Sequence, residues 1–233
     1  MAAQRILIVD DEKEIADLVA FYLEAEDYAV TCCYNGIDAV AQIQSSAFDL
    51  AILDLMLPDI DGMTLCKIIR QSHHYPIIML TAKSESIDQI TGLAVGADDY
   101  VTKPFQPLAL VARVKAQLRR FTYYNQSDKR KTPAHLLSLR GLLLNTDTHE
   151  CLLNEKLLSL TPTEFSILKV LLENVGSPVS SEQINEAVWG DAYFNKNHNS
   201  ISVHIRNLRE KMGDSFENTA YIKTVWGCGY KIE

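Results

Sequence analysis

The sequence has little in common with membrane, secreted or metal-cluster proteins. No apolar run in its 233 residues approaches the ~20 residues that a helix needs to cross a bilayer. A strand predicted at Arg5–Val9 leaves no room for a secretory signal before it, so we expect a cytoplasmic protein that does not enter membranes. The five cysteines include no C-x-x-C pair, which argues against a disulfide framework or a zinc site.

The sequence also lacks the basic excess of a protein that coats nucleic acid. Residues 1–120 hold 10 Lys and Arg against 17 Asp and Glu, a balance of −7. Residues 121–233 hold 12 against 13, a balance of −1, which completes the formal charge of −8. Any nucleic-acid site must therefore be a local patch of the surface.

The first 120 residues alternate short apolar runs with amphipathic stretches. Continuous apolar runs such as Leu50–Leu53 are typical of strands that are buried on both faces. Five such βα units predict an α/β fold, with a doubly wound, flavodoxin-like parallel sheet. The predicted strands are 5–9, 28–34, 50–54, 76–81 and 99–102, and the predicted helices are 13–26, 37–45, 63–71, 87–95 and 108–120.

Residues 121–134 are polar, charged and aperiodic, which predicts a linker between domains 1–120 and 135–233. A helical extension followed by a short loop is the alternative. The second domain begins with short β-like segments over 136–160, and Thr161 and Glu164 then form a capping box that starts a helix. Two more helices, near 181–189 and 199–212, and a strand-like tail over 221–232 complete an α+β unit.

Polar side chains follow the predicted strands of the first domain at their carboxyl ends, where open parallel sheets bind ligands. Asp10 and Asp11 follow the first strand, Asp54 ends the third, Thr81 ends the fourth and Lys103 follows the fifth. Carboxylates gathered this closely must bind a proton or a cation, and hard oxygen ligands favour Mg²⁺. With Mg²⁺ and Lys103 beside it, Asp54 can accept a phosphoryl group, and Thr81 can then bind one of the new oxygens.

Each of these residues also has a simpler explanation when it is taken alone. Two aspartates after a strand commonly cap the next helix, and a threonine at a strand end is usually structural. A single lysine is usually a solvated surface residue. The occurrence of all five at successive strand ends favours a phosphoryl site.

This combination resembles the receiver domain of two-component response regulators, over residues 4–120. The matching segments are 8–12, 53–59, 61–62, 80–82, 96–100 and 103–105. The resemblance implies a sensor histidine kinase as partner and a cis peptide bond between Lys103 and Pro104. It also implies the following roles: phosphoacceptor, Asp54; Mg²⁺ ligands, Asp10 or Asp11, Asp54 and the Met56 backbone carbonyl; switch pair, Thr81 and Tyr100; phosphoryl contact, Lys103.

Within that group, the chain resembles the OmpR/PhoB family, in which phosphorylation produces a homodimer held by charge pairs. A third family pair is missing here, because Gln89 and Ala109 stand where the family usually has Lys and Glu. We therefore expect a weaker phosphorylated dimer. The pairs that the resemblance implies are Asp99 with Arg113 and Asp98 with Arg120.

The helix predicted at 199–212 has an apolar stripe at positions 201, 205, 208 and 212, and polar side chains elsewhere. A short helix before it and a hairpin after it predict a winged helix-turn-helix, whose last helix enters the major groove. A solvated amphipathic helix is the alternative, and His204 taken alone is more often structural. The resemblance to OmpR/PhoB proteins, over 135–233, implies these DNA contacts: Asn199, Ser202, His204, Arg206, Asn207 and Arg209 in the helix, and Thr224, Trp226 and Tyr230 in the wing.

Many relatives carry Arg where this chain has Asn199, Asn207 and Trp226, so we expect DNA binding to depend less steeply on salt than it does in those relatives. The resemblance implies a transcription regulator that binds promoter direct repeats and RNA polymerase, and is no enzyme beyond self-phosphorylation and autodephosphorylation. Four stretches (75–81, 112–120, 159–168 and 221–227) resemble regulators of glycopeptide (vancomycin) resistance genes. Two other hypotheses are a DNA-binding regulator independent of phosphorylation and a phosphotransfer protein with a protein-docking output domain.

Overall fold

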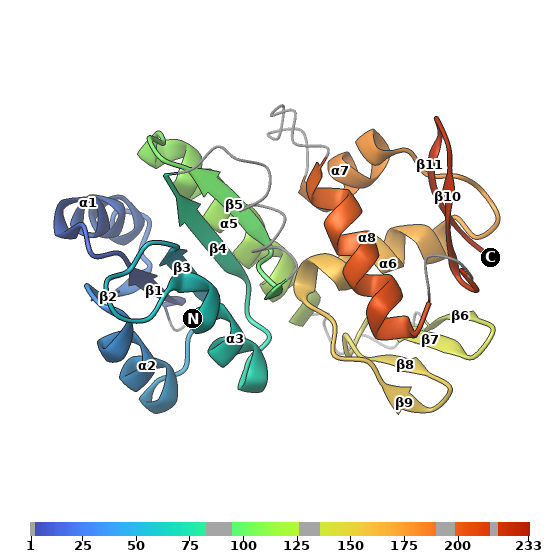
Figure 1. Cartoon of the computed structure of the whole chain (residues 1–233), viewed down its shortest axis with the longest axis horizontal. Coiled ribbons are helices and arrows are strands. Elements are labelled where there is room, and N and C mark those ends of the chain that lie inside the picture. Colours follow the sequence, from blue (N-terminus) through green and yellow to red (C-terminus); the bar gives the residue numbers. More distant parts are fainter. Residues whose placement is uncertain (1–2, 83–94, 126–135, 190–198, 215–218) are drawn as a thin grey trace. The chain divides into compact units, whose positions relative to one another are not determined.

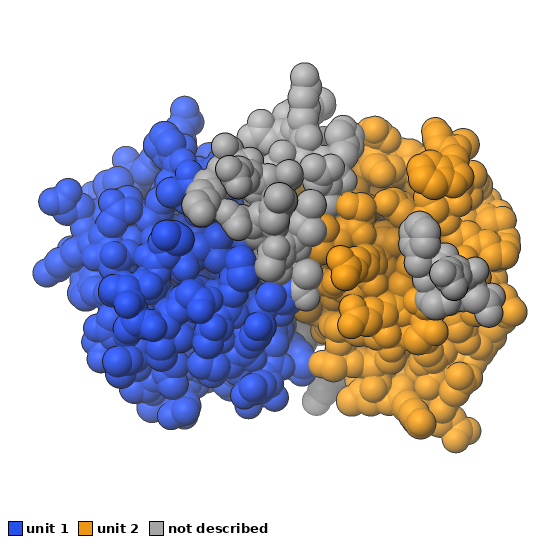
Figure 2. Space-filling model, in the orientation of Figure 1, with its two compact units in different colours: residues 1–121 blue, residues 122–233 orange. Residues whose placement is uncertain are grey.

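Two units make up the chain, residues 1–121 and 122–233, and each is described here by itself (Figure 2). The computed structural model describes residues 3–82, 95–125, 136–189, 199–214 and 219–233. Helix α5, Pro107–Asn125, continues into the predicted linker. Its extension agrees with the helical alternative as far as Asn125, while residues 126–134 lie outside the described part of the chain.

The first unit is built on a five-stranded sheet in the order β2-β1-β3-β4-β5 (Figure 1). All neighbouring strands are parallel, which confirms the doubly wound prediction. The strands are β1 Arg5–Val9, β2 Ala29–Cys33, β3 Leu50–Asp54, β4 Ile77–Thr81 and β5 Asp99–Thr102. The described helices are α1 Lys13–Glu24, α2 Gly36–Ser45, α3 Gly62–Ser72 and α5. Most of the helix predicted at 87–95 lies outside the described residues.

Helices cover both faces of this sheet (Figure 1). Apolar side chains of α1 and α5, among them Val19 and Val114, join one core with Ile8 of β1 and Ile52 of β3. Helices α2 and α3 contact each other and the strands β2 and β3. Every residue of β3 and β4 is buried, as the continuous apolar runs predicted. Because β3 and β4 pair in parallel, their carboxyl ends lie side by side.

The second unit combines an antiparallel sheet, three helices and a hairpin, as the sequence predicted. The predicted capping box is present, since the Thr161 hydroxyl and the Glu164 carboxylate each accept the other residue's backbone N–H. The sheet has the order β6-β7-β8-β9: β6 Leu136–Leu139, β7 Leu142–Asn145, β8 Cys151–Leu153 and β9 Lys156–Leu157. The helices are α6 Pro162–Glu173, α7 Ser181–Trp189 and α8 Asn199–Met212, and the hairpin strands are β10 Ile222–Val225 and β11 Gly229–Ile232.

The hairpin β10–β11 is anchored to the segment before α7. Tyr230 and Val179 exchange two backbone hydrogen bonds, of 2.8 and 2.9 Å. Gly229 makes this approach possible: its φ is +132°, and a Cβ there would lie 2.1 Å from the Val179 carbonyl oxygen. Among the described residues, no helix is both long enough and apolar enough to cross a lipid bilayer.

Candidate functional site

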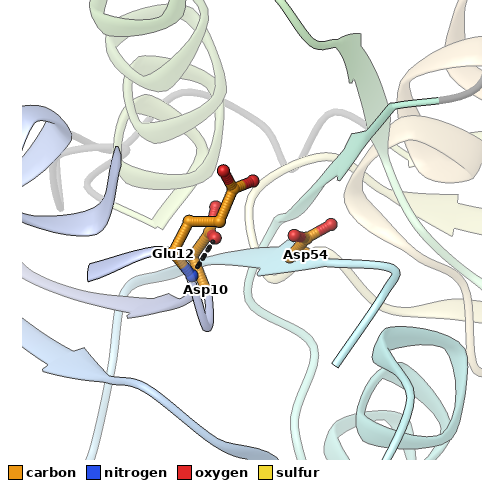
Figure 3. A group of neighbouring side chains, drawn as sticks. All are labelled: Asp10, Glu12 and Asp54. Atoms are coloured by element: carbon orange, nitrogen blue, oxygen red, sulfur yellow. Dashed lines mark hydrogen bonds between the residues drawn. The ribbon is translucent and has the colours of Figure 1, made fainter. Parts of the chain in front are cut away.

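Three carboxylates surround one ammonium group at the carboxyl edge of the parallel sheet. Asp10 follows β1, Glu12 precedes α1, Asp54 ends β3 and Lys103 follows β5. The Lys103 Nζ lies 2.8 Å from Asp10 Oδ2, 2.9 Å from Asp54 Oδ2 and 3.1 Å from Glu12 Oε1. One oxygen of each carboxylate lies within 4.8 Å of the other two, and Figure 3 shows Asp10 and Glu12 together with Asp54 across from them.

Burial sets the electrostatics of this group. Burial raises the pKa of Asp10, and the neighbouring charge of Asp54 adds to that effect, while Lys103 opposes it. Burial alone would lower the pKa of Lys103, but its bonds to Asp10 and Asp54 outweigh burial and raise that pKa. Lys103 therefore remains an ammonium ion. With all carboxyl groups ionised, the four side chains sum formally to −2, the charge that one divalent cation balances.

The loop between β3 and α3, which follows Asp54, is held in place by two sets of contacts. A Cβ on Gly62 would lie 2.1 Å from the Asp54 backbone oxygen, so only glycine lets α3 begin this close to β3. Asp59 accepts the N–H groups of Gly36 and Ile37 at 2.8 and 2.9 Å, which lowers the pKa of Asp59 and ties the loop to α2. This loop carries Met56, whose N–H donates to Asp54 Oδ1 at 3.3 Å.

The structure brings together most of the residues predicted for this site. Asp10, Asp54 and Lys103 are in contact, and the Met56 backbone lies beside Asp54. Asp11 is exposed and lies outside the carboxylate group, whereas Glu12, which the prediction omitted, belongs to it. Its place next to Asp10 and Asp11 was the available signal. Glu12 also occupies the N-cap position of α1, but its side chain makes no capping bond.

The predicted switch residues are both buried. Thr81 ends β4, and its backbone oxygen accepts the Lys103 N–H at 2.6 Å. Tyr100 lies in β5, opposite Met79 of β4 in the strand register. The peptide bond between Lys103 and Pro104 is cis, as the family resemblance implied.

Three of the four residues predicted for the dimer interface, Asp98, Asp99 and Arg113, form ion pairs within the chain. Arg113 Nη1 lies 3.1 Å from Asp99 Oδ2. Asp98 is fully buried and accepts Arg70 Nη2 at 2.7 Å and the Ile77 N–H at 3.0 Å. The resemblance implied a pair of Asp98 with Arg120, whereas the Asp98 carboxylate here joins α3 to the start of β4. Gln89 and the Arg120 side chain lie outside the described residues, and Ala109 is exposed.

Helix α8 carries most of the predicted DNA contacts, and only some of them face solvent. Its apolar stripe, which includes Ile205 and Leu208, is buried as predicted. Ser202 and Arg206 are exposed. His204 is buried beside Trp189 of α7, with ring centroids 6.2 Å apart, which corrects the expectation that it faces DNA.

Asn207 is buried as well, so the buried surface of α8 extends beyond the apolar stripe. Arg209 is half-buried, and its guanidinium donates to the Ile222 carbonyl at 2.9 and 3.0 Å and to Thr224 Oγ1 at 3.0 Å. It thus fastens α8 to β10. In the hairpin, Trp226 is 88% exposed and Tyr230 is half-buried. The side chain of Asn199 lies outside the described residues.

Comparison with known proteins identifies both units. A family described as "Response regulator receiver domain" matches residues 6–115, and one described as "Transcriptional regulatory protein, C terminal" matches residues 154–232. The chain is 58% identical to "Regulatory protein VanR" of Enterococcus faecium over 231 residues, 99% of each chain. It is 52% identical to "Regulatory protein VanRc" of Enterococcus gallinarum, again over 99% of each chain.

A solved structure extends the match to the fold of the whole chain. The response regulator DrrB, a Thermotoga maritima OmpR/PhoB homolog, has a TM-score of 0.53 and 32% identity over 99% of each chain. The carboxylate and lysine group lies in the receiver unit, and α8 with its hairpin lies in the transcription-regulating unit. The chain therefore belongs to the OmpR/PhoB family of two-component response regulators, with a receiver domain followed by a DNA-binding domain.

Proposed function

We propose that Asp54 accepts a phosphoryl group from a sensor histidine kinase and that this event activates DNA binding by the second domain. The observation that supports this most directly is the Asp54 carboxylate, held at a strand end 2.9 Å from the Lys103 ammonium. An Asp54 oxygen bonds to phosphorus while the P–N bond of the donor phosphohistidine breaks, and the imidazole keeps the electron pair. Lys103 stabilises the negative charge on the transferring oxygens.

The acidic group fits Mg²⁺ as the cofactor of this reaction. It offers hard oxygen donors, a formal charge of −2 and a buried carboxylate, Asp10, whose pKa is raised. Asp10 or Asp11, Asp54 and the Met56 backbone carbonyl would hold the ion. When bound, Mg²⁺ neutralises charge on the phosphoryl oxygens.

Phosphorylation would then change the surface formed by β5 and α5. The new group carries a charge of about −1.5 to −2 and strong acceptor oxygens. The Thr81 hydroxyl donates to one of these oxygens and moves toward it, and the Tyr100 ring turns into the space that is left. A homodimer forms on this surface when the Asp99–Arg113 pair is exchanged between chains. That exchange replaces one pair by another, so we propose that the dimer is weak, as the missing charges at Gln89 and Ala109 also imply.

The second domain supplies the DNA contacts of this proposal. The exposed Ser202 and Arg206 of α8 enter the major groove, and Trp226 in the hairpin contacts the adjacent backbone or minor groove. The dimer binds promoter direct repeats in the cytoplasm and recruits RNA polymerase. The similarity to VanR and VanRc supports control of glycopeptide (vancomycin) resistance genes.

Mass spectrometry of the full chain, incubated with acetyl phosphate and Mg²⁺, tests the phosphoryl site. We expect one acid-labile adduct on Asp54 and none in Asp54→Ala, whereas an adduct on another side chain would contradict the proposal.

DNA footprinting with and without the donor tests the output. We expect protection of two half-sites about one helical turn apart, strengthened by the donor in the native protein alone. Equal protection by Asp54→Ala would instead favour a regulator that is independent of phosphorylation.

A further inference from the structure

Three carboxylates already surround the Lys103 ammonium that an incoming phosphoryl group has to contact. An ammonium carries three N–H donors. Three carboxylate oxygens lie within hydrogen-bonding distance of Nζ, those of Asp10 at 2.8 Å, Asp54 at 2.9 Å and Glu12 at 3.1 Å. Lys103 donates hydrogen bonds to Glu12 and Asp54 and forms a close ion pair with Asp10, so a phosphoryl oxygen competes with these carboxylates for the ammonium.

The three carboxylates differ in what it costs to release them. The side chains of Asp10 and Asp54 are 0% and 5% exposed, so neither can replace its bond to Lys103 with water. The Glu12 side chain is 60% exposed, and it makes no capping bond to α1. Its backbone is fixed by a 3.0 Å hydrogen bond from its N–H to Asp10 Oδ1. Glu12 is thus the carboxylate that can turn out into solvent while the backbone beneath it stays in place.

We propose that Glu12 is a competing acceptor that slows phosphorylation of Asp54: it accepts an N–H of Lys103 in the unphosphorylated protein and yields it to the phosphoryl group. Glu12 forms no covalent bond and transfers no proton in this step. An Asp54 oxygen attacks the phosphorus, and the donor leaves with the electron pair of its bond to phosphorus. This inference rests on the proposed phosphorylation of Asp54 and adds a residue that sets its rate.

Two effects of Glu12 act in the same direction. Its bond to Lys103 must break before the transition state can use that donor, and its negative charge repels an anionic donor. One unit charge at about 4 Å in water changes the barrier enough for a roughly fivefold change in rate. We therefore expect Glu12→Gln to accelerate phosphorylation by acetyl phosphate about fivefold. Salt should shrink the part of this gain that arises from repulsion.

The experiment measures the rate of Asp54 phosphorylation in full-length chains with acetyl phosphate and saturating Mg²⁺. Glu14→Gln is the matched control, because it removes the same charge from an exposed residue of the first turn of α1. Glu12→Asp keeps the charge on a shorter side chain. We expect Glu14→Gln to match the native rate, Glu12→Gln to exceed it and Glu12→Asp to lie between them. Isothermal titration calorimetry with Mg²⁺ alone gives a second measurement on each chain.

The two measurements separate a competing acceptor from a metal ligand. A competing acceptor predicts faster phosphorylation in Glu12→Gln with Mg²⁺ affinity within about threefold of the native value. Slower phosphorylation together with a tenfold or greater loss of Mg²⁺ affinity in Glu12→Gln would overturn the inference and make Glu12 a ligand. Equal rates in Glu12→Gln and Glu14→Gln would overturn it as well. If the native chain and Glu14→Gln take up no phosphoryl group, the proposed function itself fails.

Discussion

The receiver unit and the DNA-binding unit place their functional side chains in different ways. In the receiver unit, Lys103 and Glu12 meet although 91 positions separate them, because parallel strands end at one edge of the sheet. In the DNA-binding unit, the predicted contacts share one helix and one hairpin, and packing withdraws several of them from the surface. Sheet topology therefore predicts which residues converge, whereas helical periodicity does not tell a polar side chain that binds a ligand from one that holds the fold.

The largest effect that we expect is a loss of stability in the receiver unit when a polar residue that holds the fold is removed. Asp98→Ala should lower the free energy of unfolding by about 3–5 kcal/mol, because it leaves the Arg70 guanidinium without its buried carboxylate. Asp99→Ala should cost less, since the Asp99–Arg113 pair is more exposed. Urea unfolding of both variants makes the measurement. A native-like stability of Asp98→Ala would mean that Asp98 is not a structural residue.

Removing the cation from the carboxylate group should give the next largest effect. Lys103→Gln leaves Asp10 and Asp54 buried beside each other, which should destabilise the metal-free protein by about 3 kcal/mol. Mg²⁺ should restore more stability to this variant than to the native chain, because the ion binds only the folded site. Urea unfolding with and without Mg²⁺ checks this. An equal gain from Mg²⁺ in both chains would show that Lys103 and the ion do not balance the same charges.

In the DNA-binding unit, two arginines of α8 allow a residue that holds the fold to be compared with one that is proposed to bind DNA. Arg209→Ala removes hydrogen bonds to Ile222 and Thr224, so it should cost about 1.5–3 kcal/mol of stability and leave the salt dependence of DNA binding unchanged. Arg206→Ala should leave stability unchanged and reduce the slope of log K against log salt by about 0.9. Fluorescence anisotropy over a range of salt concentrations, with urea unfolding, measures both. A reduced slope in Arg209→Ala would restore Arg209 to the DNA interface.

The smallest effect concerns His149, which sequence reasoning did not single out. Its ring stacks on Phe165 with centroids 4.6 Å apart, and burial holds the pKa of His149 below its usual value. As the pH falls below about 6.5, the unfolded chain binds this proton before the folded chain does, so stability decreases. The His149→Phe variant should lose this part of the pH dependence in urea unfolding near neutral and mildly acidic pH. An identical pH dependence in both chains would show that His149 titrates normally.

Local patterns were enough to predict most of the secondary structure. The strands at Arg5–Val9, Leu50–Asp54 and Asp99–Thr102 and the helix at Asn199–Met212 have the predicted limits. Apolar runs and the Thr161 cap are signals within a few neighbouring residues. The prediction ended α5 at position 120 because residues 121–125 carry no apolar period, although they are compatible with the helix that the structure shows.

The candidate sites were predicted less evenly. Asp10, Asp54 and Lys103 could be assigned because strand ends select them independently of side-chain conformation. The carboxylate group contains Glu12, whereas the prediction named Asp11. The sequence could not distinguish them, because the direction of a side chain in the turn after β1 depends on the backbone there. His204 and Arg209 could not be assigned, because their neighbours Trp189 and Ile222 lie in other elements.

The sequence by itself determined the two-domain architecture, the parallel sheet and the meeting of acidic and basic residues at its edge. These follow from the hydrophobic period and from the alternation of strands and helices along the chain, which depend on residue type alone. Only the tertiary structure decided which carboxylates share Lys103, that Asp98 is a buried partner of Arg70, and which side chains of α8 remain exposed. Those outcomes depend on how closely packed elements approach one another, and a buried polar group must find its partner wherever that packing places it.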